Sequence, residues 1–200
     1  RMNSGWGKLF QRAQESFHNR FWNSAKKCLF DVIDRNHEPG VNDDAVRSNQ
    51  IFAVGGLPLN LLSPAKSQMV VQIVEDRLLT PMGLRSLDPE DPSYRGTYSG
   101  DIRQRDGEYH QGTVWPWLKG PFVEAWLRVH GNTVSNRQTA HSRFVQPLLE
   151  HLQHAGLGHV SEISDGDWPH QPVGCPFQAW SVGELLRMMK IVAESAESAA

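Results

Sequence analysis

The sequence has little cysteine, little net charge and no long apolar run. Its two cysteines, Cys28 and Cys175, lack the spacing of a zinc ribbon or a disulfide framework. No run of about 18 apolar residues occurs, and the first residues lack the basic-then-apolar order of a signal peptide. The formal charge of −2 gives no reason to expect nucleic acid as a partner. We therefore expect a cytoplasmic protein with neither a membrane nor a nucleic acid as partner.

The composition favours one globular domain. The 200 residues are 39% hydrophobic, which is enough for one core and argues against two domains, so we expect a single domain over residues 1–200. Seven tryptophans are more than such a core requires, and several stand beside Gly, Pro, His and Asp. Aromatic rings in such loops either pack into the core or line a binding surface, and both interpretations remain open for each ring.

Helical periodicity dominates the chain. Ser63-Pro64 has the pattern of a helix start, and the segment after it carries Met69, Val70, Ile73 and Val74 on one face. No alternating pattern is long enough to build a sheet, so we expect an all-α fold with about six helices and long loops. Residues 195–200 are expected to form a flexible tail. Helical segments are predicted at residues 9–21, 51–62 (a short helix broken by glycines), 65–79, 114–129, 135–155 and 178–193.

Two long polar loops, residues 81–110 and 156–176, interrupt the helices. Loops of this length in a compact domain are usually functional or disordered. In the first loop, Arg85, Asp101 and several further charges either pair with one another or bind sugar hydroxyls. In the second loop, Glu162 lies in a locally apolar setting where a carboxylate needs hydrogen bonds or a chemical role. Asp165 and Asp167 flank a glycine and also fit as turn formers.

Metal and nucleophile chemistry have little support in the sequence. The acidic loop lacks the EF-hand pattern, so we expect no metal there. His151, His154 and His159 lack an acidic or cysteine ligand at a zinc-site spacing, and we interpret them as histidines of the surface or of a site's rim. No serine has the G-x-S-x-G context of a serine hydrolase. No cofactor is expected.

The segment "YHQGTVWPWLKG" places planar rings and neutral polar groups directly before a predicted helix. A structural helix start needs only a capping residue and apolar spacing. Rings interleaved with neutral donors and acceptors suit a polar, disc-shaped ligand such as a sugar ring. The residues concerned are Tyr109, His110, Gln111, Trp115 and Trp117.

Four ordered motifs carry a family resemblance. They are "RSNQIFAV" (47–54), "GLRSLDPEDPSYRGTYSGD" (83–101), "YHQGTVWPWLKGPF" (109–122) and "SEISDGDWPHQPVGCPFQAWSVGELLR" (161–187). Together they resemble the C-terminal region of bacterial glycogen debranching enzymes, the amylo-α-1,6-glucosidase family. The resemblance implies an (α/α)6 barrel similar to those of glucoamylases and trehalases, in agreement with the all-helical prediction.

The resemblance also implies an inverting, exo-acting α-1,6-glucosidase with glycogen or another branched α-glucan as substrate. Such enzymes use one carboxylic acid to protonate the leaving oxygen and a second carboxylate to activate water. Glu162 matches the general base, with Asp165 and Asp167 as rivals. The resemblance implies substrate contacts for Tyr109, His110, Gln111, Trp115, Trp117 and Trp180, with Arg85 and Asp101 in the loop beside them.

Two departures from the family pattern suggest an incomplete catalytic domain. The motif resembling "TWMDA", which carries the family's general acid, is absent. About six helices are predicted where the complete barrel has twelve, and the first residue is Arg rather than Met. We therefore expect the C-terminal half of a barrel, weakly active or inactive alone, with the missing N-terminal half as a partner. A non-catalytic glucan-binding module and a trehalase-like glucosidase of the same superfamily remain as alternatives.

Overall fold

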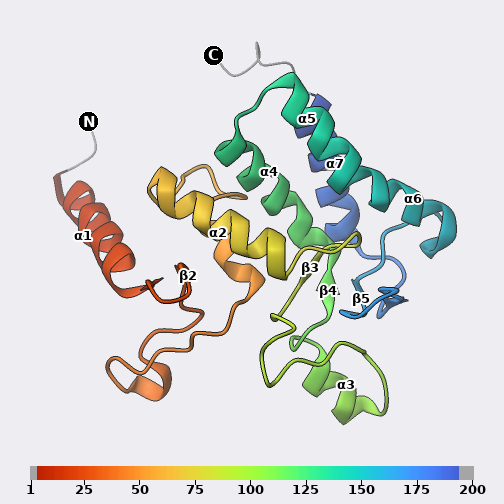
Figure 1. Ribbon diagram of the computed structural model, residues 1–200, viewed down its shortest axis with the longest axis horizontal. Helices are drawn as coiled ribbons and strands as arrows, with labels where there is room; N and C mark the ends of the chain where they lie inside the picture. Colours follow the sequence, from red (N-terminus) through yellow and green to blue (C-terminus); the bar gives the residue numbers. More distant parts are fainter. Residues whose placement is uncertain (1–3, 194–200) are drawn as a thin grey trace.

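The computed structural model describes residues 4–193, so the expected tail at 195–200 lies outside the described residues. The described chain is mainly helical, as predicted, and Figure 1 shows the helices as a curved array. None of its helices is both long and apolar enough to cross a membrane. The α-helices are α1 (Ser4–Arg20), α2 (Pro64–Arg77), α3 (Ile102–Glu108), α4 (Lys119–His130), α5 (Val134–Ala140), α6 (Gln146–His154) and α7 (Ala179–Ala193).

The main core lies where α4 packs between α2 and α7. Phe122 of α4 is fully buried and meets the ring of Phe144 edge-on, with the ring centroids 5.2 Å apart. The predicted helix 135–155 is a continuous helical run in which a π-helical segment, His141–Val145, joins α5 to α6. Pro147 stands at the start of α6, and because proline has no N–H to donate, the regular hydrogen-bond ladder changes at this point.

The start of helix α2 was predicted from the sequence, whereas helix α3 was not. The Ser63 hydroxyl accepts a hydrogen bond from the Lys66 N–H, and Pro64 occupies the first turn of α2, as predicted. Helix α3 was not predicted. It consists of seven residues inside the 81–110 loop, none of them buried, so it has no apolar periodicity to detect.

A small sheet corrects the prediction that no sheet forms. Its four antiparallel strands follow the order β3-β4-β5-β6, and each has two residues, too few for an alternating pattern. Gly83 lies so close to β4 that an added Cβ would come within 2.4 Å of the Trp115 carbonyl oxygen, so a side chain there would separate the strands. The strands are β3 (Leu84–Arg85), β4 (Val114–Trp115), β5 (Ile163–Ser164) and β6 (Pro172–Val173).

Short elements also replace parts of two predicted helices. A 3₁₀ helix, Ser48–Ala53, stands in place of the helix expected over residues 51–62. Strand β4 and a 3₁₀ turn, Pro116–Leu118, occupy the first residues of the helix expected over 114–129. A separate hairpin, β1 (Trp22–Asn23) and β2 (Cys28–Leu29), follows α1.

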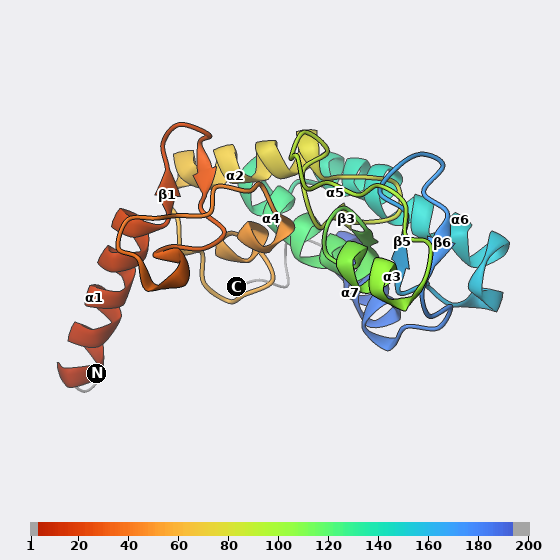
Figure 2. The same cartoon turned by 90° about the horizontal axis from the view of Figure 1, so that it is seen from below.

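Helix α1 projects from one end of the molecule (Figure 2). It carries exposed apolar side chains, with Trp6 68% and Leu9 55% exposed. Only near its C-terminal end does it approach the rest of the chain, where Phe17 and Phe21 pack on the core as half-buried residues. The apolar side of α1 is therefore largely uncovered in the described chain.

Candidate active site

The small sheet and the start of α7 gather most of the predicted aromatic residues into one cluster. The Trp117 and Trp180 rings stack with centroids 5.2 Å apart and 21° between their planes. The rings of His110 and Trp115 stack at 5.3 Å and 10°. Tyr109 meets Trp115 edge-on at 4.9 Å. The structure thus brings together five of the predicted substrate-contacting residues.

A cavity of about 390 Å³ opens beside this cluster. Trp115 and Trp180 supply flat apolar walls, and Gln111 and Arg47 supply polar groups. Apolar walls with a few oriented polar groups are the usual composition of a small-ligand site. The lining residues are Asp31, Asp43, Arg47, Ser48, Asn49, Ser86, His110, Gln111, Trp115, Trp117, Leu118 and Trp180.

Arg47 orders one side of the cavity through several hydrogen bonds. Its Nη1 donates to the His110 carbonyl oxygen at 2.7 Å and to that of Ser86 at 3.2 Å, and its Nη2 donates to the Gln111 Oε1 at 2.9 Å. Its Nε lies 3.5 Å from Asp31 Oδ2. Burial raises the pKa of Asp31, and the charge of Arg47 opposes that rise.

Arg47 and Asp31 were not predicted as site residues. Arg47 is the first residue of the "RSNQ" motif, which was one of the four motifs that carry the family resemblance. Asp31 lies in the short segment "CLFDVID", which gave no sign that it would reach the cavity.

The Glu162 carboxylate is half-buried and accepts three hydrogen bonds. The Tyr109 hydroxyl donates to Oε1 at 2.5 Å, the Gln178 amide donates to Oε1 at 3.3 Å, and the Cys175 N–H donates to Oε2 at 3.0 Å. Burial and the bond to Glu162 hold the pKa of Tyr109 above its usual range. Because a carboxylate offers about four lone-pair sites, these donors leave room for one more, such as a water molecule.

The backbone beside Glu162 needs a glycine. Gly174 has φ of +72°, a left-handed conformation that costs other residues free energy, and an added Cβ would come within 2.8 Å of Glu162 Oε2. The Glu162 N–H also donates to the Cys175 carbonyl oxygen at 2.8 Å. Glu162 is therefore held in place by backbone and side-chain bonds, and Tyr109 links it to the aromatic cluster.

Asp165 and Asp167 tie the two long loops together. Asp165 Oδ1 accepts the Tyr98 N–H at 2.8 Å, and Asp167 Oδ1 accepts the Tyr94 hydroxyl at 3.0 Å. The Asp167 N–H donates to the Gly96 carbonyl oxygen at 3.0 Å. Burial and the bond to Asp167 raise the pKa of Tyr94 to about 12. Both carboxylates therefore hold the two loops together, and their role as rivals of Glu162 stays a prediction.

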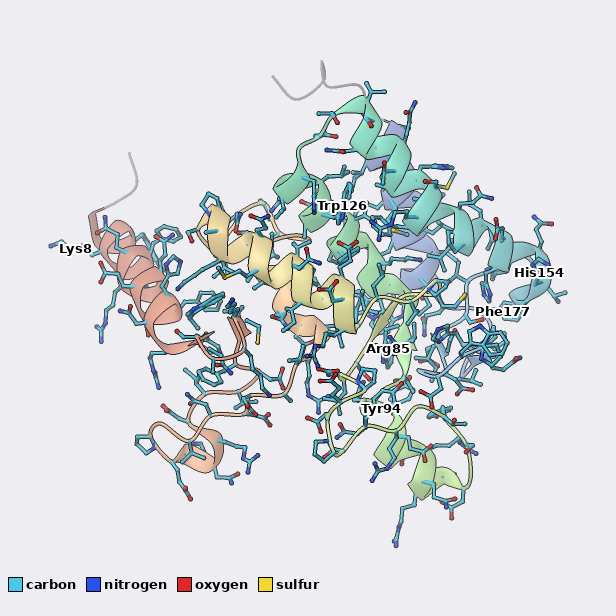
Figure 3. The ribbon with its side chains drawn as sticks, in the orientation of Figure 1. Lys8, Arg85, Tyr94, Trp126, His154 and Phe177 are labelled. Carbon is cyan, nitrogen blue, oxygen red and sulfur yellow. The ribbon has the colours of Figure 1, made fainter. Side chains whose placement is uncertain are left out.

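Arg85 and Asp101 lie outside the lining of this cavity, as do Glu162 and Tyr109. Arg85 Nε donates to the Gly166 carbonyl oxygen at 2.9 Å, and Figure 3 shows Arg85 close to Tyr94 beside the sheet. Asp101 is exposed at the start of α3, where its carboxylate accepts the Gln104 N–H at 2.9 Å and completes a capping box. Their contacts account for both residues as structural, so their predicted substrate contacts stay a prediction.

Replacing Asp101 by alanine tests whether Asp101 is structural. Loss of an N-cap typically costs about 1 kcal/mol, so we expect faster amide hydrogen exchange over residues 102–108 and unchanged glucan affinity. Asp106→Ala, on the same helix, is the matched control, for which no cap is lost. A large fall in glucan affinity in Asp101→Ala alone would instead place Asp101 in the substrate site.

His151 is buried, which corrects the surface interpretation for this histidine, whereas His154 and His159 are exposed; that His151 lies at the rim of a site stays a prediction. It is 6% exposed, and its Nε2 lies 3.2 Å from the Ser161 Oγ and accepts the Ser161 N–H at 3.4 Å. Burial, followed by the charge of His154, lowers the pKa of His151. Helical spacing alone did not show which side of α6 faces the loop. Within residues 4–193, no group of three or more potential ligands is arranged to hold a metal ion.

The helical array and the aromatic cavity define a partial (α/α)6 barrel of the six-hairpin glycosidase type. Residues 2–187 match the family described as amylo-alpha-1,6-glucosidase. The chain therefore belongs to the amylo-alpha-1,6-glucosidase family, which confirms the predicted family. The bacterial part of that expectation stays a prediction.

The chain is also similar to one curated protein in sequence and to two solved structures in fold. The chain is 30% identical over 162 residues to the glycogen debranching enzyme of Saccharomyces cerevisiae, covering 72% of this chain and 10% of the relative. Neutral trehalase Nth1 from the same yeast matches 96% of this chain and 31% of its own, with a TM-score of 0.63 and 14% identity. The GH63 mannosylglycerate hydrolase of Thermus thermophilus matches 90% and 36%, with a TM-score of 0.58 and 18% identity.

The chain covers only part of the length of each of these relatives. The chain spans about a tenth of the length of the curated relative. At 14% and 18% identity, the two solved structures share the fold and nothing finer with this chain. The chain matches about a third of each solved structure, in agreement with the predicted partial (α/α)6 barrel; that it is the C-terminal half stays a prediction.

Proposed function

We propose that the chain is the glucan-facing half of an inverting, exo-acting α-1,6-glucosidase that removes glucose from branched α-glucans such as glycogen. The observation that carries the proposal is the Glu162 carboxylate, fixed by three donors and linked through Tyr109 to an aromatic and polar cavity. The family supports this reaction class. A cytoplasmic location is part of the same proposal.

Glu162 acts as the general base. In an inverting glycosidase, one carboxylate removes a proton from water as that water attacks the anomeric carbon, and a carboxylic acid protonates the leaving oxygen from the opposite side. The donors on Glu162 fix its oxygens, and the lone-pair site that they leave holds the attacking water. Attack from the opposite face releases β-glucose from an α-linked substrate.

The cavity holds the glucose ring. Trp180, which is 47% exposed, offers its ring to the apolar C–H surface of the sugar, Trp115 forms the buried floor behind it, and Gln111 offers its amide to the hydroxyls. Arg47 keeps Gln111 and the His110 backbone in place through its hydrogen bonds. This arrangement orients the ring before reaction, which reduces the entropy lost at the transition state.

The general acid comes from the half of the barrel that this chain does not contain. Asp165 and Asp167 are engaged in holding the loops. The uncovered apolar side of α1, with Trp6 and Leu9 exposed, is a surface that helices of the other half would cover. General acid catalysis is typically worth on the order of 10²- to 10⁴-fold, so the chain alone is weakly active or inactive.

A binding experiment on the chain alone tests the cavity separately from catalysis. We expect Trp180→Ala to weaken the binding of a branched limit dextrin about tenfold, because one wall of the cavity is lost. Glu162→Gln should bind nearly as tightly as the unmodified chain, since the amide has the same size as the carboxylate. Unchanged binding in Trp180→Ala, measured by titration calorimetry, would contradict the proposed cavity.

Two alternatives predict different results. If the chain is a glucan-binding module without chemistry, Trp180→Ala would still weaken glucan binding. Glu162→Gln would then leave glucose release by the longer protein unchanged. A trehalase-like glucosidase of the same superfamily would release glucose from another linkage, which analysis of products from defined disaccharides would show.

A further inference from the structure

Trp168 presents a large aromatic ring to solvent at the turn of the β5–β6 hairpin. Its side chain is 85% exposed, whereas Trp115 in the adjacent strand is 5% exposed. It stands midway between Ser164 and Pro172, which are paired across the hairpin. Exposed apolar side chains are common on protein surfaces, so exposure alone does not indicate a function.

The backbone on both sides of Trp168 is fixed. The Arg85 guanidinium holds the Gly166 carbonyl oxygen at 2.9 Å, and the Asp167 N–H holds that of Gly96 at 3.0 Å. On the other side of Trp168, His170 is 9% exposed. Its backbone N–H donates to the Asp167 carbonyl oxygen at 2.8 Å, and its Nδ1 lies 3.0 Å from the Asp165 carbonyl oxygen. A ring on a fixed backbone loses little conformational entropy when it binds a ligand.

The Trp168 turn is connected to the cavity along two routes. Asp167 contacts Tyr94 and Gly96, and between them the Arg95 N–H donates to the carbonyl oxygen of Gln111, a residue of the cavity wall. Ser164, on the same hairpin, pairs with Val114, which directly precedes Trp115 of the cavity wall. The hairpin that carries Trp168 is therefore bonded to two segments that contribute to the cavity wall.

We propose that Trp168 is an outer stacking platform for the glucan, contacting sugar units beyond the one held in the cavity. This inference rests on the proposed function. Among the neighbours of Trp168 in the chain, the polar residues Asp167 and Gln171 are exposed, whereas His170 is buried. A flat apolar face with polar groups around it suits a sugar ring, whose hydroxyls surround an apolar C–H face, whereas a protein partner favours a larger contiguous apolar patch.

The test compares short and long ligands by titration calorimetry. For Trp168→Ala, we expect about a tenfold loss of affinity for a long branched limit dextrin and unchanged affinity for isomaltose, which on this proposal occupies the cavity without contacting Trp168. Trp168→Phe keeps an aromatic face and should recover most of the affinity. Trp6→Ala is the matched control, because Trp6 is 68% exposed on the distant α1, and we expect it to bind both ligands normally.

The outcomes separate this inference from the proposed function. Suppose that Trp168→Ala binds the long dextrin as tightly as the unmodified chain, while Trp180→Ala binds it weakly. The proposed stacking on Trp168 is then wrong, and the proposed glucan binding in the cavity is supported. If Trp168→Ala loses affinity for isomaltose to the same extent, the ring supports the loop and is no platform. If the unmodified chain binds no glucan, the proposed function fails and this inference fails with it.

Discussion

Glu162→Gln should lower glucose release by the complete catalytic domain on the order of 10²- to 10⁴-fold. The amide cannot accept a proton from the attacking water, although it has the size of the carboxylate. Its one oxygen can still accept the Cys175 N–H, and its NH2 group can donate to the Tyr109 hydroxyl oxygen in place of the bond that Glu162 accepts. We therefore expect the loss in kcat, with little change in glucan affinity or melting temperature. Steady-state kinetics on a branched limit dextrin measure the effect.

The rival carboxylates provide matched controls for this experiment. Asp165→Asn and Asp167→Asn keep an oxygen that can accept the Tyr98 N–H and the Tyr94 hydroxyl, so they should lower kcat far less than Glu162→Gln does. Each is expected to lower the melting temperature modestly, because a charge-assisted bond between the loops becomes a neutral one. An inactive Asp167→Asn enzyme beside an active Glu162→Gln enzyme would assign the base to Asp167 instead.

Lys119→Met should raise the free energy of unfolding by about 5 kcal/mol at pH 6. Lys119 is fully buried at the start of α4, and among residues 4–193 its ammonium has a single hydrogen-bond acceptor, the Pro81 carbonyl oxygen at 2.5 Å. Burial lowers its pKa to about 7. Each pKa unit corresponds to about 1.4 kcal/mol, and methionine fills a similar volume without a charge. Pro81 is itself exposed, so its carbonyl can bond to water in the variant.

The gain from Lys119→Met should shrink as the pH rises. Below pH 7 the lysine carries its proton in both states, and the folded state bears the full cost of the buried charge. Above pH 7 the folded state releases the proton while the unfolded state keeps it, so the unfolding free energy of the unmodified chain rises, by about 2 kcal/mol between pH 7 and pH 9.

Urea unfolding at pH 6 and pH 9 measures this difference directly. The exposed Lys8, labelled on α1 in Figure 3, provides the control Lys8→Met, which should change stability little at either pH. A stability gain for Lys119→Met that is the same at both pH values would mean that Lys119 does not titrate between them in the folded protein.

The helices could be predicted from the sequence where a buried face repeats along the chain. Helix α2 has both its cap, Ser63, and an apolar face that includes Val70 and Val74. Helix α3 and the small sheet could not be predicted, because α3 buries no residue and each strand is only two residues long. These elements depend on contacts between distant segments, such as Gly83 against Trp115, which local periodicity does not encode.

The candidate site could be predicted in part for the same reason. The motif around Tyr109 and Trp115 indicated a sugar-binding surface, and the structure gathers its rings around a cavity. The sequence did not show that Asp31 and Arg47 would join that cavity from more than sixty residues away, as the Arg47 to Gln111 bond shows. It also gave no sign that Asp101 would be engaged in capping a helix, because the helix itself was not predicted.

Glucose release from a branched limit dextrin, by this chain alone and with the missing half of the barrel supplied as a separate polypeptide, tests the central claim most directly. We predict release only when both halves are present, with β-glucose as the first product and with loss of activity in Glu162→Gln. Release by the chain alone at the rate of the two halves together would contradict the claim, because the general acid would then lie within these 200 residues.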